Sequence, residues 1–600
     1  MKFRDLLRKP LAAAALSFLL PGLGQAAAGD RRRGAIVAIP AFALLGTILA
    51  VAIVDRSAVF GLAVDQQWLT SLLLLDLVAL IYHIWAIVDS YLVATLAAPQ
   101  KKRVNAPANK WAPILGIGII LFGTVAVHGG IAKVDMDWQR ALYCLTAKIP
   151  CWVTDNPASV DPNATDPNAT DPNATGIAQV SDGPGPISSG AKASATPMPT
   201  YDISKIATFS TTNDSQNWDA DGELNVLLLG LGVQSDPSQL GPDTIMVLHT
   251  STTTGQAELI SIGRNNYCTP MPTQEIAAHY PSPPYNCPAG TWGPLLNGLP
   301  IEILGHCDRW PIPEFKSTCG QPRDQNRYLR AYKGFEMTIG NLLGIRIDGS
   351  MWMNPVGLST LVDAVGGVNI TVQTRLFDKP CGPAGSQQQK LGSQLQVPGN
   401  ATCQDTSHWG YYVPTGMSGV QNMKDAAAAS GGGLAVYQVP GHDPDVAFVM
   451  APGTYHMNGD WALAYARTRI YDAGGDYSRA ARQQTLLSSL RKGLDPCRFA
   501  SLGNVLPLLG VVQAVPYGFN TDMDVTNPQN IKSWAGLAKS VLGENVQQLV
   551  LDPQKVGMPA SATYVAWDAT TIAKARALVN DNFQKAPKAS PGSGGGATCG

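Results

Sequence analysis

The first part of this chain is almost uniformly apolar, and no other feature constrains its fold as strongly. Three apolar runs lie at residues 34–54, 68–94 and 111–134, and each is long enough to cross a bilayer at about 20 residues per span. Basic clusters precede the first run, at 31–33, and separate the second from the third, at 101–103. Because basic loops stay in the cytoplasm, three spans would carry everything after the third run outside the cell. The sequence predicts a multi-pass membrane protein whose C-terminal domain is extracytoplasmic.

The residues before these runs are not predicted to cross the membrane. Residues 1–30 are predicted to be a cytoplasmic N-terminus followed by a re-entrant or interfacial hairpin between Leu11 and Ala28, because a fourth span would invert the topology. Within the second run, Asp76 and His83 lie seven residues apart and therefore near one helix face. Ionisable groups at this depth point to function, but hydrogen bonding between helices is the favoured role for this pair.

The cysteines support the same topology. All ten lie at or beyond Cys144, on one side of the apolar region, and they lack the paired short gaps of a zinc site. Disulfides formed in an oxidising compartment are therefore expected, with the pairing left open. The formal net charge of −1 gives no reason to expect a nucleic-acid partner.

The rest of the chain divides into a spacer, a globular domain and a tail. After the membrane region (31–134), residues 135–222 contain DPNAT three times and no apolar period, so they are predicted to be an extracytoplasmic linker. Residues 223–583 form the domain, and the Gly/Ser-rich residues 584–600 are expected to be disordered. Strands are predicted at 225–230, 244–250, 258–262 and 369–372, helices at 328–343 and 355–365, and irregular insertions at 268–322 and 378–445. This mixture predicts an α/β fold, an α-β-α sandwich around a mixed sheet.

An arginine-rich stretch, WALAYARTRIYDAGGDYSRAARQQ from Trp461 to Gln484, is the strongest candidate for a functional site. Asn458 and Gly459 open a short helix before it, and Ser478 is the predicted N-cap of a second helix. Arg479 and Arg482 would then stand in the first turn of that helix, where the macrodipole disfavours cations. A phosphate or pyrophosphate bound at the start of the helix would explain why two arginines stand where the macrodipole disfavours cations. Pairing with nearby carboxylates is the simpler alternative.

This stretch resembles the closing motif of the LytR–CpsA–Psr family, whose members attach polymers to the bacterial cell wall. The resemblance extends over residues 223–583 and includes the segments 343–348 and 361–368. Two other signatures are only partly kept. Gly232 and Gln234 stand where the family has aspartate and arginine, whereas Asp243, Thr244 and Arg264 match.

The resemblance implies a phosphotransferase of the bacterial plasma membrane that moves a glycopolymer from a polyprenyl-pyrophosphate carrier onto peptidoglycan. It implies catalytic roles for a set of charged residues: Arg264, Arg467, Arg469, Asp476, Arg479 and Arg482. Guanidinium groups suit the neutralisation of a diphosphate, and phosphoryl transfer needs mainly positioning and charge. Asp243 is the expected ligand of Mg²⁺. Gln483, Leu486 and Leu490 are expected to contact the substrate and its lipid, although core packing explains the leucines equally well.

Two readings compete within this family. The first is an active ligase. The second is a polyprenyl-phosphate or wall-polymer binding protein of the same fold with weak or absent turnover, which the changes at Gly232 and Gln234 favour. A purely structural wall protein is a weaker third reading, since it gives no reason for the arginines to cluster.

Overall fold

The computed structural model describes most of the chain in separate stretches, namely residues 9–54, 64–97, 111–154, 222–231, 241–312, 315, 319, 326–378, 419–438, 446–468, 475–493, 505–524 and 546–588. The chain divides into two compact units. One comprises residues 1–142 with 525–531, and the other comprises residues 143–524 with 532–600.

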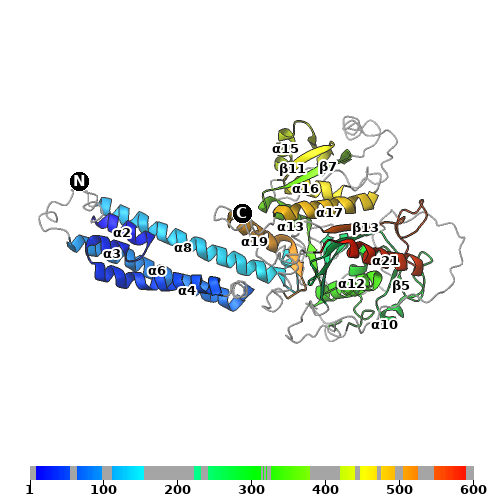
Figure 1. Ribbon diagram of the computed structural model, residues 1–600, viewed down its shortest axis with the longest axis horizontal. Coiled ribbons are helices and arrows are strands. Elements are labelled where there is room, and N and C mark those ends of the chain that lie inside the picture. The colour runs from blue at the N-terminus through cyan, green and yellow to red at the C-terminus, as the bar shows by residue number, and fades with distance from the viewer. Residues whose placement is uncertain are drawn as a thin grey trace, which may run out of the picture. The chain divides into compact units, whose positions relative to one another are not determined.

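The N-terminal unit is helical, and a long helix covers each of the three apolar runs (Figure 1). These helices are α4 (Arg31–Val54), α6 (Gln66–Ala97) and α8 (Trp111–Leu145). Among the described residues, two segments are long and apolar enough to cross a membrane, Gln66–Ala97 and Pro113–Leu145, each with a mean hydropathy of 2.1. Two apolar helices of spanning length are thus present, and the third predicted span, on α4, stays a prediction.

Two short helices occupy the predicted hairpin between Leu11 and Ala28. They are α2 (Pro10–Leu19) and α3 (Leu23–Ala28), and Gly22 between them has a φ of 97°, a left-handed conformation that glycine adopts without strain. Gly24 makes the close packing possible, because a Cβ there would lie 2.1 Å from the Ala13 carbonyl oxygen. The hairpin is therefore helical, and its depth in a bilayer stays a prediction.

The C-terminal unit is built on a six-stranded mixed sheet with the order β12-β6-β1-β2-β3-β13. Its strands are β1 (Glu223–Leu231), β2 (Pro242–Ser251), β3 (Ala257–Ile262), β6 (Gly349–Met353), β12 (Phe519–Thr521) and β13 (Gln547–Leu551). β2 runs antiparallel to β1 and β3, whereas β6 pairs with β1, and β13 with β3, in parallel. The predicted strands at 225–230, 244–250 and 258–262 are confirmed.

Helices cover both faces of this sheet, as predicted (Figure 1). On one face, α12 (Arg327–Leu343) and α21 (Ala569–Lys585) join a core with alternate strand residues such as Ile260 and Ile262. Ser261 points to the other face, where its hydroxyl accepts a hydrogen bond from α17 (Gly475–Gly493). Because successive strand residues face opposite sides, α17 lies across the sheet from α12 and α21. The domain is an α/β sandwich of three layers.

A second core lies under α17. It joins α13 (Pro355–Ala364) and α16 (Gly459–Arg467) to β7 (Val368–Val372), with Trp461 fully buried in it. The predicted helices at 328–343 and 355–365 and the strand at 369–372 are confirmed by α12, α13 and β7.

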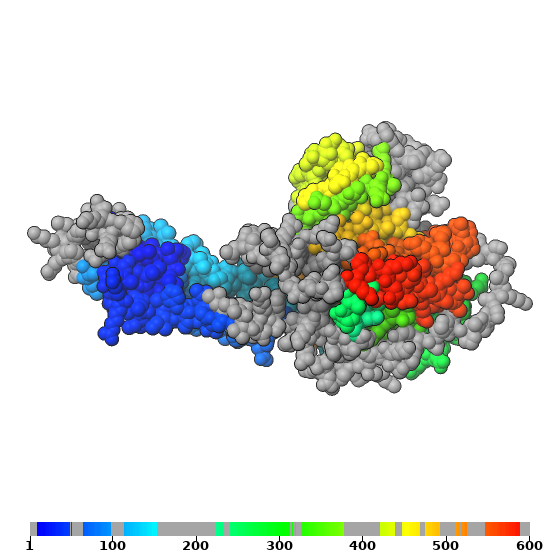
Figure 2. All heavy atoms as spheres, in the orientation of Figure 1, coloured from blue at the N-terminus to red at the C-terminus, as the bar shows by residue number. Residues whose placement is uncertain are grey.

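The two predicted insertions contain regular structure of their own. The first holds β4 (Thr269–Pro270), α10 (Gln274–Ala277), β5 (Thr291–Trp292), the 3₁₀ helix η3 (Leu296–Gly298) and α11 (Leu299–Gly305). The second and its neighbours hold β8 (Leu376–Asp378), α15 (Gly419–Ala429), β9 (Leu434–Gln438), β10 (Val446–Met450) and β11 (Gly453–Met457). Short helices α9 (Cys151–Thr154) and α19 (Val505–Gly518) complete the described elements. In Figure 2 the described part of the second insertion and the strands beside it form a yellow-green lobe, and α21 with the segment before it forms an orange-red surface.

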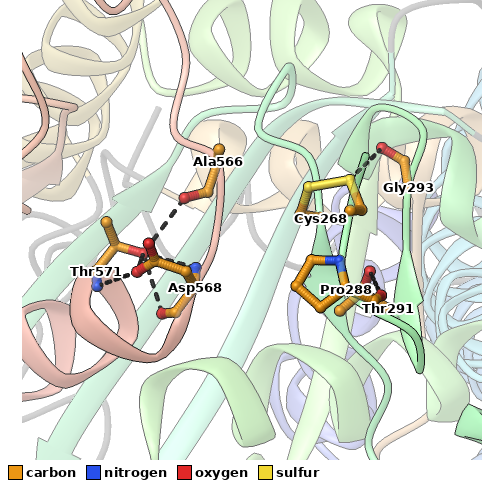
Figure 3. Close-up of a disulfide and its surroundings, with 8 residues drawn as sticks. Cys268, Pro288, Thr291, Gly293, Ala566, Asp568 and Thr571 are labelled. Atoms are coloured by element: carbon orange, nitrogen blue, oxygen red, sulfur yellow. Dashed lines mark hydrogen bonds between the residues drawn. A yellow bond between two sulfur atoms is a disulfide. The ribbon is translucent and has the colours of Figure 1, made fainter. Parts of the chain in front are cut away.

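Disulfides join the described cysteines, as the sequence predicts. The pairs are Cys144–Cys151, Cys268–Cys287 and Cys307–Cys319. Figure 3 shows Cys268 beside the segment that carries Thr291 and Gly293, and, across from it, the start of α21. There Asp568 and Thr571 form a capping box that satisfies the first turn of the helix.

Candidate functional site

Two arginines from distant parts of the sequence meet above the end of β3. Arg264 follows β3 after Gly263, and its Nη1 forms an ion pair with Oδ1 of Asp243 in β2. Arg479 lies in α17, and its Nη2 donates a hydrogen bond of 3.2 Å to the backbone carbonyl of Asp243, 236 positions away in the sequence. The sheet edge and α17 therefore bring Asp243, Arg264 and Arg479 into one cluster.

Asp476 joins the two guanidinium groups. Its Oδ1 lies 3.2 Å from Nη2 of Arg479, and its Oδ2 lies 3.7 Å from Nε of Arg264. The side chain of Asp476 is only 5% exposed, whereas that of Asp243 is 28% exposed. Asp476 is thus held inside the cluster, and Asp243 is the carboxylate that a ligand can reach.

Arg479 is buried and Arg264 is nearly so, with 6% and 13% of their side chains exposed. Burial opposes the charge on Arg264, but the carboxylates of Asp243 and Asp476 outweigh it and raise the pKa of this guanidinium above its ordinary value. Arg264 is therefore a fixed positive charge. Side chains and backbone around it line one small pocket, which includes Thr244, Met246, Ser261, Arg264, Arg479 and Gln483.

The start of α17 differs from the prediction. The helix begins at Gly475, so Ser478 lies inside it and is not the N-cap. Asp476 occupies the first turn, where the macrodipole favours an anion. Arg479 then stands one turn further along, where it reaches Asp476 three residues before it. The reasoning that two arginines share the first turn was wrong because Gly475, with a φ of 54°, allows the helix to start earlier.

The other predicted arginines have different surroundings. Arg482 is buried and donates through Nε to the Tyr465 carbonyl at 3.0 Å and through Nη2 to the Thr468 carbonyl. These carbonyls end α16, so Arg482 caps that helix and holds it to α17. Arg467 is the last residue of α16, and Arg469 lies outside the described residues.

Of the three residues predicted to contact the substrate, one lines the pocket and two lie in the second core. Gln483 lines the pocket, and its Nε2 donates to the Ala466 carbonyl at 3.1 Å. Leu486 and Leu490 pack in the second core, with 2% and 4% of their surface exposed. Their position fits the core-packing alternative, and contact with a lipid chain stays a prediction.

Three residues near the site, Tyr477, Asn266 and Gln484, were not singled out from the sequence. Tyr477 donates a hydrogen bond of 2.8 Å to Oδ1 of Asn266, which fixes the start of α17 against the loop after β3. Gln484 is 1% exposed and donates to the Leu259 and Leu549 carbonyls of β3 and β13, both at 3.0 Å. Its position four residues after the buried Ala480, on one helix face, is the signal that could have revealed Gln484.

Gly263 explains how Tyr477 fits. A Cβ at this position would lie 3.0 Å from Cε1 of Tyr477 and 2.8 Å from Oδ1 of Asn266. Only a residue without a side chain leaves room for this contact at the unchanged backbone.

The donor set bears on a metal ion. Within the stretches that the structure describes, no three His, Cys, Asp or Glu side chains gather in a way that could hold a metal ion. The cluster offers Asp243 as a reachable carboxylate, with Asp476 enclosed between the arginines. This set suits Mg²⁺ only where substrate oxygens provide most of the ligands.

Part of this domain, including α17, is similar to known proteins. Residues 325–580 match the LytR_cpsA_psr family, so the resemblance seen in the sequence is confirmed. The chain is 24% identical over 191 residues to the biofilm regulatory protein A of Streptococcus mutans, covering 32% of this chain and 31% of that protein. It is 26% identical over 141 residues to the polyisoprenyl-teichoic acid–peptidoglycan teichoic acid transferase TagV of Bacillus subtilis, covering 23% of this chain and 34% of that protein.

The chain thus spans about a third of the length of each of these curated relatives. Among solved structures, the protein gbs0355 of Streptococcus agalactiae is similar, with 18% identity, coverage of 63% of this chain and 94% of that chain, and a TM-score of 0.34.

Proposed function

The chain carries a LytR_cpsA_psr family domain, and from this premise we propose that its C-terminal unit is a membrane-anchored phosphotransferase. Its donor would be a glycopolymer on a polyprenyl-pyrophosphate carrier, and its acceptor a hydroxyl of peptidoglycan. The observation that carries the proposal is the meeting of Arg264 and Arg479 beside a reachable carboxylate, Asp243. The printed name of the Bacillus subtilis relative, a polyisoprenyl-teichoic acid–peptidoglycan transferase, describes the same class of reaction.

The reaction exchanges a phosphoanhydride bond for a phosphate ester bond. The acceptor oxygen bonds to the phosphorus that carries the polymer, and the bond from that phosphorus to the bridging oxygen breaks. Polyprenyl phosphate leaves with the electron pair, and the hydroxyl proton passes to solvent. Negative charge accumulates on the leaving phosphate, so the step needs positive groups fixed in advance.

The arginines are suited to this task. Arg264 and Arg479 present planar donors that can bind phosphate oxygens in pairs. Asp476 touches both and is nearly enclosed, so its role is to orient them. Both carboxylate oxygens of Asp476 face guanidinium groups, which argues against Asp476 as the group that deprotonates the acceptor.

Mg²⁺ belongs to the proposal as a shared ligand of protein and substrate. Asp243 would hold it, and the ion would supply positive charge between phosphate oxygens when bound. Since Asp243 pairs with Arg264, substrate oxygens would have to take over that arginine.

A second candidate function is binding without turnover. The charge of Arg264 is already matched by Asp243 and Asp476, which favours a site that holds a phosphate weakly over one that drives its transfer. The same experiment separates the two candidates.

Release of polyprenyl phosphate from a lipid-linked polymer, measured with the full-length protein in lipid nanodiscs, tests the proposal. We expect Arg479→Ala to lower the rate about 10²–10³-fold, as removal of a fixed charge-stabilising donor does in other enzymes. Arg479→Lys keeps the charge without the paired donors and should recover only part of it. The matched control is Arg375→Ala, which changes an exposed arginine of the same unit.

An Arg479→Ala protein as active as the Arg375→Ala control would refute the transferase. Binding of polyprenyl pyrophosphate by the wild type, lost in Arg479→Ala and without any release, would establish the binding protein instead.

A further inference from the structure

A chain of hydrogen bonds runs through the N-terminal unit and joins three of its helices. Oδ1 of Asp76 in α6 lies 2.8 Å from Nδ1 of His128 in α8. Nε2 of His128 lies 3.2 Å from Nδ1 of His83, which is also in α6. Nε2 of His83 then lies 3.1 Å from the Ser17 carbonyl and 3.0 Å from the Phe18 carbonyl, at the end of α2.

The partners at one end fix the number of protons in this chain. Carbonyl oxygens only accept, so Nε2 of His83 must carry a proton. Nδ1 of His83 and Nε2 of His128 face each other, and one of them must carry a proton because two lone pairs repel. The contact between His128 and Asp76 needs a third proton, either on the imidazole or on the carboxyl.

A carboxylate and two neutral imidazoles together carry only two such protons. We propose that Asp76, His128 and His83 form a proton-binding site that holds one proton more and so ties α2 to α6 and α8. The third proton resides between the rings with Asp76 ionised, or on Asp76 with both rings neutral. The two forms have the same number of protons and the same net charge of zero.

Charge supports this assignment. The side chains of His128 and Asp76 are 11% and 15% exposed, among helices that are otherwise apolar. Loss of the third proton would leave a net charge of −1 there and would set two lone pairs 3.2 Å apart. The rings would have to separate, which would loosen the contact between His83 and the end of α2.

Apart from the contact with His128, the ion pairs found in the described part of this unit do not involve the carboxylate of Asp76. The segments of α2 and α3 contain no ionisable side chain. On α4, Arg33 forms an ion pair with Asp89 of α6, and the Tyr82 hydroxyl donates to the Val37 carbonyl. On α8, Lys133 pairs with Asp137 at 2.6 Å. The negative charge of Asp76 is therefore balanced within the chain of hydrogen bonds itself.

This inference is independent of the proposed transferase, and the full-length protein can test it in lipid nanodiscs at pH 7.5. Solid-state NMR of ¹⁵N-labelled histidine rings and of the Asp76 carboxyl carbon counts the protons. We expect three, seen either as a proton shared between His83 and His128 or as a protonated Asp76. An ionised Asp76 together with two neutral rings would overturn the proposal.

Substitution of Asp76 distinguishes a bound third proton from hydrogen bonding between the helices without one. In Asp76→Asn the amide can donate to His128, so the chain of hydrogen bonds persists with two neutral rings and no third proton. Asp76→Glu keeps a carboxyl and should keep the third proton, and Asp137→Asn, on an exposed carboxylate of α8, should leave the ring spectra unchanged. A cross-peak between the rings of Phe18 and His83, which stack with centroids 6.2 Å apart, shows that α2 is still in place.

Ring spectra in Asp76→Asn that match the wild type, with this cross-peak present and with the wild-type Asp76 carboxyl ionised, would overturn the proposal. If Asp76→Asn does not fold, the proton count in Asp76→Glu decides, because a carboxylate with two neutral rings there contradicts the site.

Discussion

Replacement of Gln484 by leucine should loosen α17, the helix that carries Arg479, without creating a cavity. The two side chains are similar in size, so the change removes hydrogen bonds and little packing. Nε2 of Gln484 reaches the carbonyls of Leu259 and Leu549 at 3.0 Å and the Ser261 hydroxyl at 2.8 Å. These contacts bridge β3 and β13, so this one amide fastens α17 to two strands of the sheet.

The magnitude follows from the number of donors. An amide nitrogen has two protons, so the three acceptors share two full hydrogen bonds. Loss of each one, including the cost of leaving its buried acceptor without a donor, costs about 1.5 kcal/mol. Because Gln484 is 1% exposed, water cannot replace the lost donor. The opening free energy of α17 should therefore fall by about 3 kcal/mol, which corresponds to a factor of about 150 in the opening equilibrium.

Hydrogen exchange followed by mass spectrometry on the full-length protein measures this quantity for peptides within Gly475–Gly493. The matched control is Gln548→Leu, because Gln548 also bonds to α17, at 2.9 Å from Ser488, but is exposed. That variant should change exchange by less than about threefold. The reasoning fails if exchange in α17 rises by less than about fivefold in Gln484→Leu, or equally in both variants.

Two further predictions concern stability. Burial and the nearby Asp363 raise the pKa of Asp460 from 3.8 to about 6. The folded protein therefore holds this proton more tightly than the unfolded chain does. As a result, the free energy of unfolding falls as the pH rises from about 4 to 6. Asp460→Asn should therefore raise the thermal midpoint at pH 8, by up to about 3 kcal/mol in free energy. It should have little effect at pH 3.5, where Asp460 is mostly protonated in both the folded and the unfolded chain. An equal gain at both pH values in thermal melts would contradict this. Replacing Cys268 and Cys287 by serine removes a link across 19 positions and should destabilise the first insertion by about 3 kcal/mol, against about 2 kcal/mol for the Cys144–Cys151 pair, which spans seven. Limited proteolysis within residues 268–312 measures it, and cleavage as slow as in the wild type would count against the estimate.

The sequence alone predicted the elements that depend on local pattern. The buried strands at 225–230, 244–250 and 258–262 and the amphipathic helix at 328–343 were predictable, because alternation and helical spacing of apolar residues reflect which face is buried. The family resemblance, and the expectation that Arg264 and Arg479 belong to the site, also came from sequence motifs. The formation of disulfides followed from the distribution of cysteines, but the pairing did not.

The arrangement of the site was decided by the tertiary structure. Arg479 and Arg482 look equivalent in the sequence, yet Arg479 faces Asp243 and Asp476, whereas Arg482 caps α16. Arg482 follows Arg479 by three residues, so the two side chains point about 60° apart around the helix axis. Only the packing of α17 on β3 determines which of them faces the pocket. The first turn of α17 was misplaced for a related reason, since Gly475 extends the helix beyond the local capping signal at Ser478.

The N-terminal unit shows the same division. The apolar runs and the ionisable residues Asp76 and His83 are visible in the sequence, and so is their common helix face. That His128, from a different helix, stands between them could not be predicted, because helical periodicity describes one helix and says nothing of which neighbour it meets. Residue pattern determines which faces are buried, and only the folded chain determines which buried groups meet.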